Sequence, residues 1–557
     1  MSISLNIKRS LAQNEQFLVD YDLEYQIETN GETLVTHQAT ITNLQNDAIP
    51  TTYTFSAKQL EIYDVTAITN KKDAGIKIED KDGDKLISVV IENYSIGEGR
   101  QNIISLNYKT DDVAIKSGNI WNVYIPRIQI PETTTLYNVK LSIPKSFGDK
   151  IYLSPTPVIE KSEDDFRVYY FTKETFKSTG IIAAFGEYQP MNFKLKYQIK
   201  NRSILPSIEK IALPSDIQGY QNISYKSIDP KPKSTRVDED GNIIAAYVLN
   251  PLKKMEIELT GTARLYGRQI NPDFGRSISG IPDDLIKKYT LPKKYWEVDS
   301  PAVLEVADEL KDENLNTTKN AQKVYNFIRD NITYDFDAVE QGLVERKGAE
   351  AAITQEGKWT CMEFSDLFIT LTRAMGIPSR EINGYAYTFD NNNKPLSINL
   401  NNGESLHSWA EFYDPFYGWV QVDPTWGTTS GIDYFTKLDT NHLAFVVKGV
   451  DSEYPYPAGT YRFSDKDKLI DVAISQSTSD EDFLPKMEFQ KVLNLNLIEI
   501  LKGNIKVKAK NTGTVTAYEI QTKVIPAYSS SNIFVKKDTT EISFEDINGN
   551  VYTKAIK

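Results

Sequence analysis

Three side chains of this sequence have the types that nucleophilic catalysis requires. Cys361 is the single cysteine of the chain, and His407 and Asp423 follow it within about 60 residues. In cysteine acyl transfer a thiolate attacks, an imidazole carries its proton, and a carboxylate orients the imidazole. The three residues therefore predict cysteine-based chemistry, provided that the fold brings them together.

Cys361 lies where a helix is expected to begin. Thr360 and Glu363 have the spacing of a capping box, and Gly376 and Pro378 close an apolar stripe of helical period. In the first turn of a helix, unpaired N–H groups and the helix dipole favour a thiolate. The alternative is that Cys361 is a small core residue, since free cysteine is often buried.

His407 and Asp423 fall on two segments that are expected to form a hairpin. His407, Trp409 and Tyr413 share one face of the first strand, and Trp419 and Asp423 share one face of the second. If Tyr413 pairs with Trp419, His407 is diagonal to Asp423 at roughly 7 Å or less. A slip of one residue would separate them. A structural histidine and a turn acid before proline are the alternatives.

The elements around these residues predict an α+β segment between β modules. Helical spacing follows Asp299-Ser300-Pro301 and continues over residues 317–331, whereas period-two alternation marks strands at 19–27, 193–199, 255–259 and 505–510. We expect four domains. These are an N-terminal β-sandwich (1–187), a second β-sandwich (188–275), an α+β core (276–450) and a C-terminal β-sandwich (451–557).

Composition narrows the class of protein. The chain has 557 residues, 63 Lys plus Arg, 76 Asp plus Glu and a net charge of −13, so it has no basic excess for nucleic acid. The single cysteine excludes an intrachain disulfide framework and a multi-thiolate metal site, and the count of three histidines argues against a histidine-rich metal centre. No apolar run is long enough to span a membrane. We predict no metal and no cofactor, and the oligomeric state stays open.

The motifs around the three residues resemble the core of the transglutaminase-like superfamily. The matching segments are GKWTCMEF at 357–364, RAMGIPSR at 373–380, HSW at 407–409 and DPT at 423–425. The resemblance implies a papain-like fold over about 290–445. It also implies Cys361 as nucleophile, His407 as base and then acid, and Asp423 as its orienter. Thr360 and Met362 stand where tissue transglutaminases have Gln and Trp, so Gln–Lys cross-linking does not carry over.

Further residues are candidates for the oxyanion site or the cleft. The backbone N–H of Cys361 is the first candidate donor, and Trp359 and Gln355 are candidates for a second. Trp409 is a candidate for the cleft wall, although core packing is the more frequent fate of tryptophan. We expect His442 to be structural, because no acid or thiol stands directly beside it in the sequence.

Two functions of different class follow from these observations. The first is a transglutaminase-like cysteine acyltransferase, peptidase or amidase, acting on a protein or peptide amide, with cell-wall peptides among the candidates. The second is a non-catalytic surface or adhesion protein that uses the transglutaminase-like domain as a binding scaffold. The N-terminus shows no signal peptide. We nevertheless expect an extracytoplasmic or cell-surface location if the chain is part of a longer exported protein.

Overall fold

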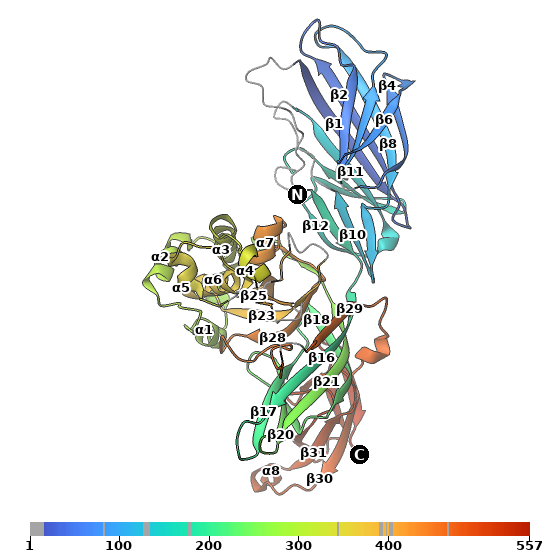
Figure 1. The fold of residues 1–557 in the computed structure, drawn as a ribbon. Helices are drawn as coiled ribbons and strands as arrows, with labels where there is room; N and C mark the ends of the chain where they lie inside the picture. Colours follow the sequence, from blue (N-terminus) through green and yellow to red (C-terminus); the bar gives the residue numbers. More distant parts are fainter. Residues whose placement is uncertain are drawn as a thin grey trace. The chain divides into compact units, whose positions relative to one another are not determined.

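The structure is a computed structural model, and it describes residues 16–58, 60–81, 84–125, 134–175, 180–341, 345–388, 394–396, 398–399, 405–464 and 467–557. The chain forms two compact units, 1–187 and 188–557. Strands predominate in both (Figure 1). Among the described residues, no helix combines the length and the hydropathy that a membrane crossing needs.

The described residues of unit 1–187 form three sheets. The largest has the order β13-β14-β11-β1-β2-β8-β4-β5, and the others are β12-β15-β10-β9 and β3-β7-β6. The alternation predicted at 19–27 is confirmed in β1, whose inward residues join a core of their own unit. The strands are β1 (Phe17–Ile27), β2 (Thr33–Asn43), β3 (Thr52–Lys58), β4 (Tyr63–Thr69), β5 (Lys72–Asp73), β6 (Ile76–Lys81), β7 (Asp84–Val90), β8 (Gln101–Thr110), β9 (Ala114–Ser117), β10 (Ile120–Ile125), β11 (Tyr137–Pro144), β12 (Lys150–Ser154), β13 (Ile159–Glu163), β14 (Phe166–Phe171) and β15 (Ile181–Phe185).

Unit 188–557 begins with a sandwich of two sheets, β18-β21-β16-β29 and β17-β20-β19, which share one core. Its strands are β16 (Gln189–Lys200), β17 (Ser207–Leu213), β18 (Gln221–Asp229), β19 (Ser234–Val237), β20 (Ile243–Leu249), β21 (Lys254–Leu265) and β29 (Ile470–Ile474). A short pair, β22 (Arg268–Gln269) with β27 (Lys437–Leu438), follows. This sandwich supports the α+β core.

The α+β core packs helices against a sheet of the order β24-β25-β23-β28, with β26 paired to β25. Helices predicted after Pro301 and over 317–331 are confirmed as α2 and α3. The helices are α1 (Asp283–Tyr289), α2 (Pro301–Leu310), α3 (Thr317–Asn331), α4 (Phe336–Gln341), α5 (Ala349–Thr354), α6 (Cys361–Ala374) and α7 (Pro424–Ser430). The strands are β23 (Ser379–Ala386), β24 (Ile398–Asn399), β25 (Ser405–Asp414), β26 (Gly418–Val422) and β28 (His442–Lys448).

The C-terminal module pairs the sheets β30-β31-β34 and β33-β32-β35-β36 around a separate core. Its elements are β30 (Met487–Val492), α8 (Leu497–Leu501), β31 (Asn504–Asn511), β32 (Ala517–Ile520), β33 (Lys523–Ile525), β34 (Ser530–Lys536), β35 (Glu541–Glu545) and β36 (Val551–Ala555). The expected β-rich, multidomain fold around an α+β core is therefore confirmed.

The boundaries of the four expected domains stay a prediction, but two observations bear on their definition. β29 lies in the segment assigned to the C-terminal domain, yet it pairs with β16 of the second sandwich. Buried amides also join that sandwich to the core, because Gln221 and Asn242 donate to the carbonyls of Ala444 and Val447. Residues 188–557 thus form one unit rather than three loosely joined domains.

Candidate active site

Helix α6 begins at Cys361 and fixes the position of its thiol. The backbone N–H of Thr360 donates to the Glu363 carboxylate over 3.1 Å, which completes half of the predicted capping box. Just upstream, Trp359 pairs with Tyr334 in an isolated β-bridge. The apolar face of α6 is embedded in the core, so the first turn has little freedom to move.

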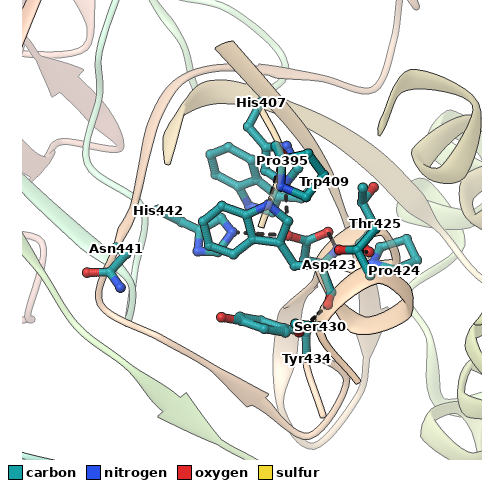
Figure 2. Close-up of polar contacts among 12 residues, drawn as sticks. Pro395, His407, Trp409, Asp423, Pro424, Thr425, Ser430, Tyr434, Asn441 and His442 are labelled. Carbon is teal, nitrogen blue, oxygen red and sulfur yellow. Dashed lines mark hydrogen bonds and ion pairs between the residues drawn. The ribbon is translucent and has the colours of Figure 1, made fainter. Parts of the chain in front are cut away.

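The hairpin of β25 and β26 brings His407 to Asp423. Its register places Tyr413 opposite Trp419, as predicted. His407 Nε2 then lies 2.8 Å from Asp423 Oδ2 (Figure 2). Asp423 is also the N-cap of α7, where its Oδ1 accepts from the backbone N–H of Trp426 over 3.0 Å. The carboxylate is therefore held from both sides.

The thiol of Cys361 interacts with the same imidazole that Asp423 orients. Burial lowers the pKa of His407, but the charge and hydrogen bond of Asp423, together with the Cys361 thiol, outweigh it and raise the pKa to about 9. Nδ1 makes no hydrogen bond of good geometry with any described residue. Because Asp423 occupies Nε2, Nδ1 is the nitrogen that is left for the thiol. A protonated imidazole is the cation that stabilises a thiolate.

The structure adds a second histidine to this group. His442, at the start of β28, points its Nε2 at the same Asp423 Oδ2 over 3.3 Å (Figure 2). Its Nδ1 lies 2.8 Å from Asp439, whose carboxylate also accepts from the Tyr434 hydroxyl. The expectation that no acid accompanies His442 is wrong. The sequence signal for this contact is the spacing Asp439-x-x-His442. It lies in a turn, so the periodic patterns of helices and strands do not reveal it.

Shared hydrogen bonds keep these buried acids ionised. Burial alone would raise the pKa of Asp423, but the charges and hydrogen bonds of His407 and His442 hold it well below its usual range. In the same way His442 lowers the pKa of Asp439 to about 2, against the effect of burial. Burial lowers the pKa of His442, but the carboxylates of Asp439 and Asp423 outweigh this effect and raise the pKa to about 9. Anions and cations thus alternate through the site.

Two tryptophans enclose the imidazoles. The Trp426 ring lies 5.1 Å from His407 and 4.7 Å from His442, centroid to centroid, and its indole N–H donates to the carbonyl of Pro395. Trp409 is fully buried, and its N–H donates to Gln421. The role of Trp409 in a cleft wall stays a prediction, because Trp409 is as fully buried as His407 and Asp423.

The other two candidate residues lie in the segment between the end of α5 and the start of α6. Trp359 is 5% exposed, next to Thr360, with the Lys347 ammonium 5.5 Å from its ring centroid. Gln355 is exposed, at the end of α5. Their roles as oxyanion donors stay predictions.

The site is closed in this conformation. Cys361, His407 and Asp423 each have 0% exposure. An acyl donor thus reaches the sulfur only if surrounding groups move.

Among the described residues, His407, Asp423 and His442 offer one ligand atom each within 4.8 Å of one another, which is close enough to hold a metal ion. Their mutual hydrogen bonds already satisfy these atoms.

Comparison with known proteins agrees with the fold of the α+β core. Residues 305–424 match the family model of the transglutaminase-like superfamily, so the chain contains a transglutaminase-like core. The chain is similar to the uncharacterized protein YebA of Bacillus subtilis (24% identity, 53% of this chain, 42% of that protein). An uncharacterized Haemophilus influenzae protein is 28% identical over 22% of this chain and 35% of its own length.

Among solved structures, the chain is similar to "a Putative Cysteine Protease from Cytophaga hutchinsonii". The identity is 16%, the TM-score is 0.33, and the match covers 52% of this chain and 99% of that one. The chain spans less than half the length of the two curated relatives that it matches.

Proposed function

We propose that this protein is a transglutaminase-like cysteine enzyme that transfers or hydrolyses the acyl group of a protein or peptide amide. One observation carries the proposal: the thiol at the start of α6 interacts with an imidazole whose Nε2 is 2.8 Å from a buried carboxylate. A scaffold without catalysis has no need for this arrangement. Enclosure of ionised groups is costly unless each has a partner, and here each has one.

The proposed reaction has two steps. The Cys361 sulfur attacks the amide carbonyl, the C–N bond breaks, and His407 gives its proton to the leaving amine, which leaves a thioester. Water or a second amine then attacks the thioester and loses a proton to His407, and the thiolate is released. The backbone N–H of Cys361, at the first position of α6, is the proposed donor to the oxyanion. Asp423 holds the imidazole throughout.

The test is turnover of amide substrates by Cys361→Ala and by the unmodified protein. A peptide library incubated with and without a primary-amine probe, and analysed by mass spectrometry, separates hydrolysis from transfer. We expect product from the unmodified protein only. Substitution of Thr428, a hydroxyl residue of α7 outside the proposed triad, by Ala is the control. Full turnover by Cys361→Ala would refute the proposal.

The closed site favours a second candidate, the binding scaffold. All three proposed catalytic residues are fully buried, as structural residues often are. Alkylation of Cys361 against pH distinguishes the two functions. A catalytic pair gives reaction well below pH 8.5 that depends on His407, whereas an ordinary thiol titrates near 8.5 whether or not His407→Ala is present. An exported location also stays a prediction, which cell fractionation can test.

A further inference from the structure

The C-terminal module carries an unusual group of exposed aliphatic side chains around α8. Their exposures range from 47% to 88%, and α8 contributes no buried residue. The helix is nevertheless ordered, because the Asn496 side chain caps the N–H groups of Ile498 and Glu499. A group of this size is more than the scattered apolar residues of a normal surface. Its members are Leu493, Leu495, Leu497, Ile498, Ile500 and Leu501.

A second apolar loop lies at the same end of unit 188–557. β16 ends at Lys200, and the following turn exposes Ile204 (81%) and Leu205 (67%). Leu252 (63%) belongs to the adjacent turn between β20 and β21. Figure 1 shows these strand ends and α8 together at the lower end of this unit. We call the two groups of side chains the aliphatic end.

Contacts within the unit explain why α8 projects away from the sandwich. The backbone N–H of Tyr225, in the middle of β18, donates to the carbonyl of Thr514, and the Tyr528 hydroxyl donates to the Tyr225 carbonyl. These contacts join the sandwich to the ends of β31 and β34 that lie far from α8. The opposite ends of β31 and β34, with α8 beyond them, point outward.

The aliphatic end is basic in an otherwise acidic protein. Segments 200–205, 250–254, 491–506 and 536–538 contain nine lysines and arginines but only two acids, whereas the whole chain has a net charge of −13. One of the acids, Glu499, forms an ion pair with Lys502 at 3.0 Å and accepts a hydrogen bond from the Asn504 amide at 2.6 Å. The local charge therefore complements an anionic surface.

We propose that the aliphatic end docks on the surface of an anionic lipid bilayer. Exposed leucine and isoleucine side chains enter the boundary between headgroups and acyl chains, and lysines beside them meet the anionic headgroups. A protein interface is a poorer match, because lysine is depleted in such interfaces and leucine is rare among their hot spots. Docking there would hold the transglutaminase-like core of unit 188–557 beside a membrane.

The experiment is flotation of the full chain with vesicles. The vesicles contain either equal parts of phosphatidylcholine and phosphatidylglycerol or phosphatidylcholine alone. We expect binding to the anionic vesicles only, weakened at least fivefold by Leu497→Ser/Leu501→Ser. Lys253→Glu/Lys537→Glu should weaken it similarly. The matched control is Val551→Ser, because Val551 is 64% exposed in the same module but outside the aliphatic end.

Several results would overturn the proposal. They are no flotation of the unmodified chain, equal binding to both vesicle types, or unchanged binding by the serine double variant with an unchanged thermal unfolding curve. A dimer in light scattering that the serine variant dissociates, without vesicle binding, would instead assign the aliphatic end to a second copy of the chain. Cys361→Ala should float normally, so this test is independent of the proposed chemistry.

Discussion

Asp423 is the residue on which the proposed chemistry depends most, because one of its oxygens serves two imidazoles. His407 approaches it at 2.8 Å and His442 at 3.3 Å. Two partners fix the orientation of the carboxylate. They also stabilise its ionised form relative to its protonated form. His442 and Asp439 therefore form an outer pair that positions the carboxylate, which in turn positions His407.

Loss of either member of the outer pair should weaken the interaction between the Cys361 thiol and the His407 imidazole without abolishing it. We predict that His442→Asn and Asp439→Asn each slow alkylation of Cys361 at pH 7 by about tenfold and move its pH profile upward, because Asp423 loses a fixed partner. The measurement is the rate of reaction with iodoacetamide against pH. His37→Asn, a buried histidine of unit 1–187, is the control. An unchanged profile in His442→Asn would show that His442 only fills space.

The same groups predict how stability depends on pH. His407 and His442 have pKa values raised to about 9, so their contribution is complete below about 6.5 and is lost as pH rises through 9. The free energy of unfolding of unit 188–557 should therefore fall by roughly 5 kcal/mol between pH 6.5 and 9.5, because both imidazoles lose their protons in this range. Urea unfolding followed by tryptophan fluorescence measures it, since five of the six tryptophans are in this unit. In His442→Asn the free energy of unfolding should fall less over the same pH range. An equal fall would show that His442 does not contribute to this pH dependence.

At the scale of elements, close packing of three strands sets the site. Gly384 of β23 pairs with His407 of β25 on one side and with Ala444 of β28 on the other. A Cβ at this glycine would overlap the Leu443 carbonyl oxygen and lie 2.9 Å from the Trp409 ring. A side chain here would push apart the strands that carry His407 and His442.

We predict that Gly384→Ala destabilises unit 188–557 by at least about 2 kcal/mol, because backbone on both sides must shift. It should also slow alkylation of Cys361 under native conditions. Gly357→Ala is the control, since the nearest heavy atom to its new Cβ would be 3.7 Å away, in Trp359. Equal stability of the two variants in urea would argue against strand spacing as the cause.

The sequence was sufficient to predict the elements but not all their interactions. The helix start at Cys361 and the register of the hairpin follow from local patterns, and both are confirmed. Arg373 and Arg380, by contrast, are shared with the family motif, yet their roles emerge only from tertiary contacts. Arg373 donates to three backbone carbonyls, and Arg380 pairs with Glu411. Such partners come from distant segments, which periodicity does not reveal.

At the scale of the molecule, the two units have separate cores. Residues of unit 1–187 form one hydrophobic cluster, and those of the sandwich, the α+β core and the C-terminal module form others within 188–557. We predict that residues 188–557 fold alone and retain the pH profile of Cys361 alkylation within about twofold. Expression of this segment, with circular dichroism as the control for folding, tests it. An unfolded segment would show that unit 1–187 is required.

Complete enclosure of the sulfur also protects it. Peroxide converts an accessible thiolate to sulfenic and then to irreversible acids, and low pKa with exposure makes this fast. A sulfur with no solvent contact meets peroxide, like any other small reagent, only when the site opens. Sensitivity to oxidants then becomes a report on opening: the faster peroxide consumes the thiol, the more often the site is open.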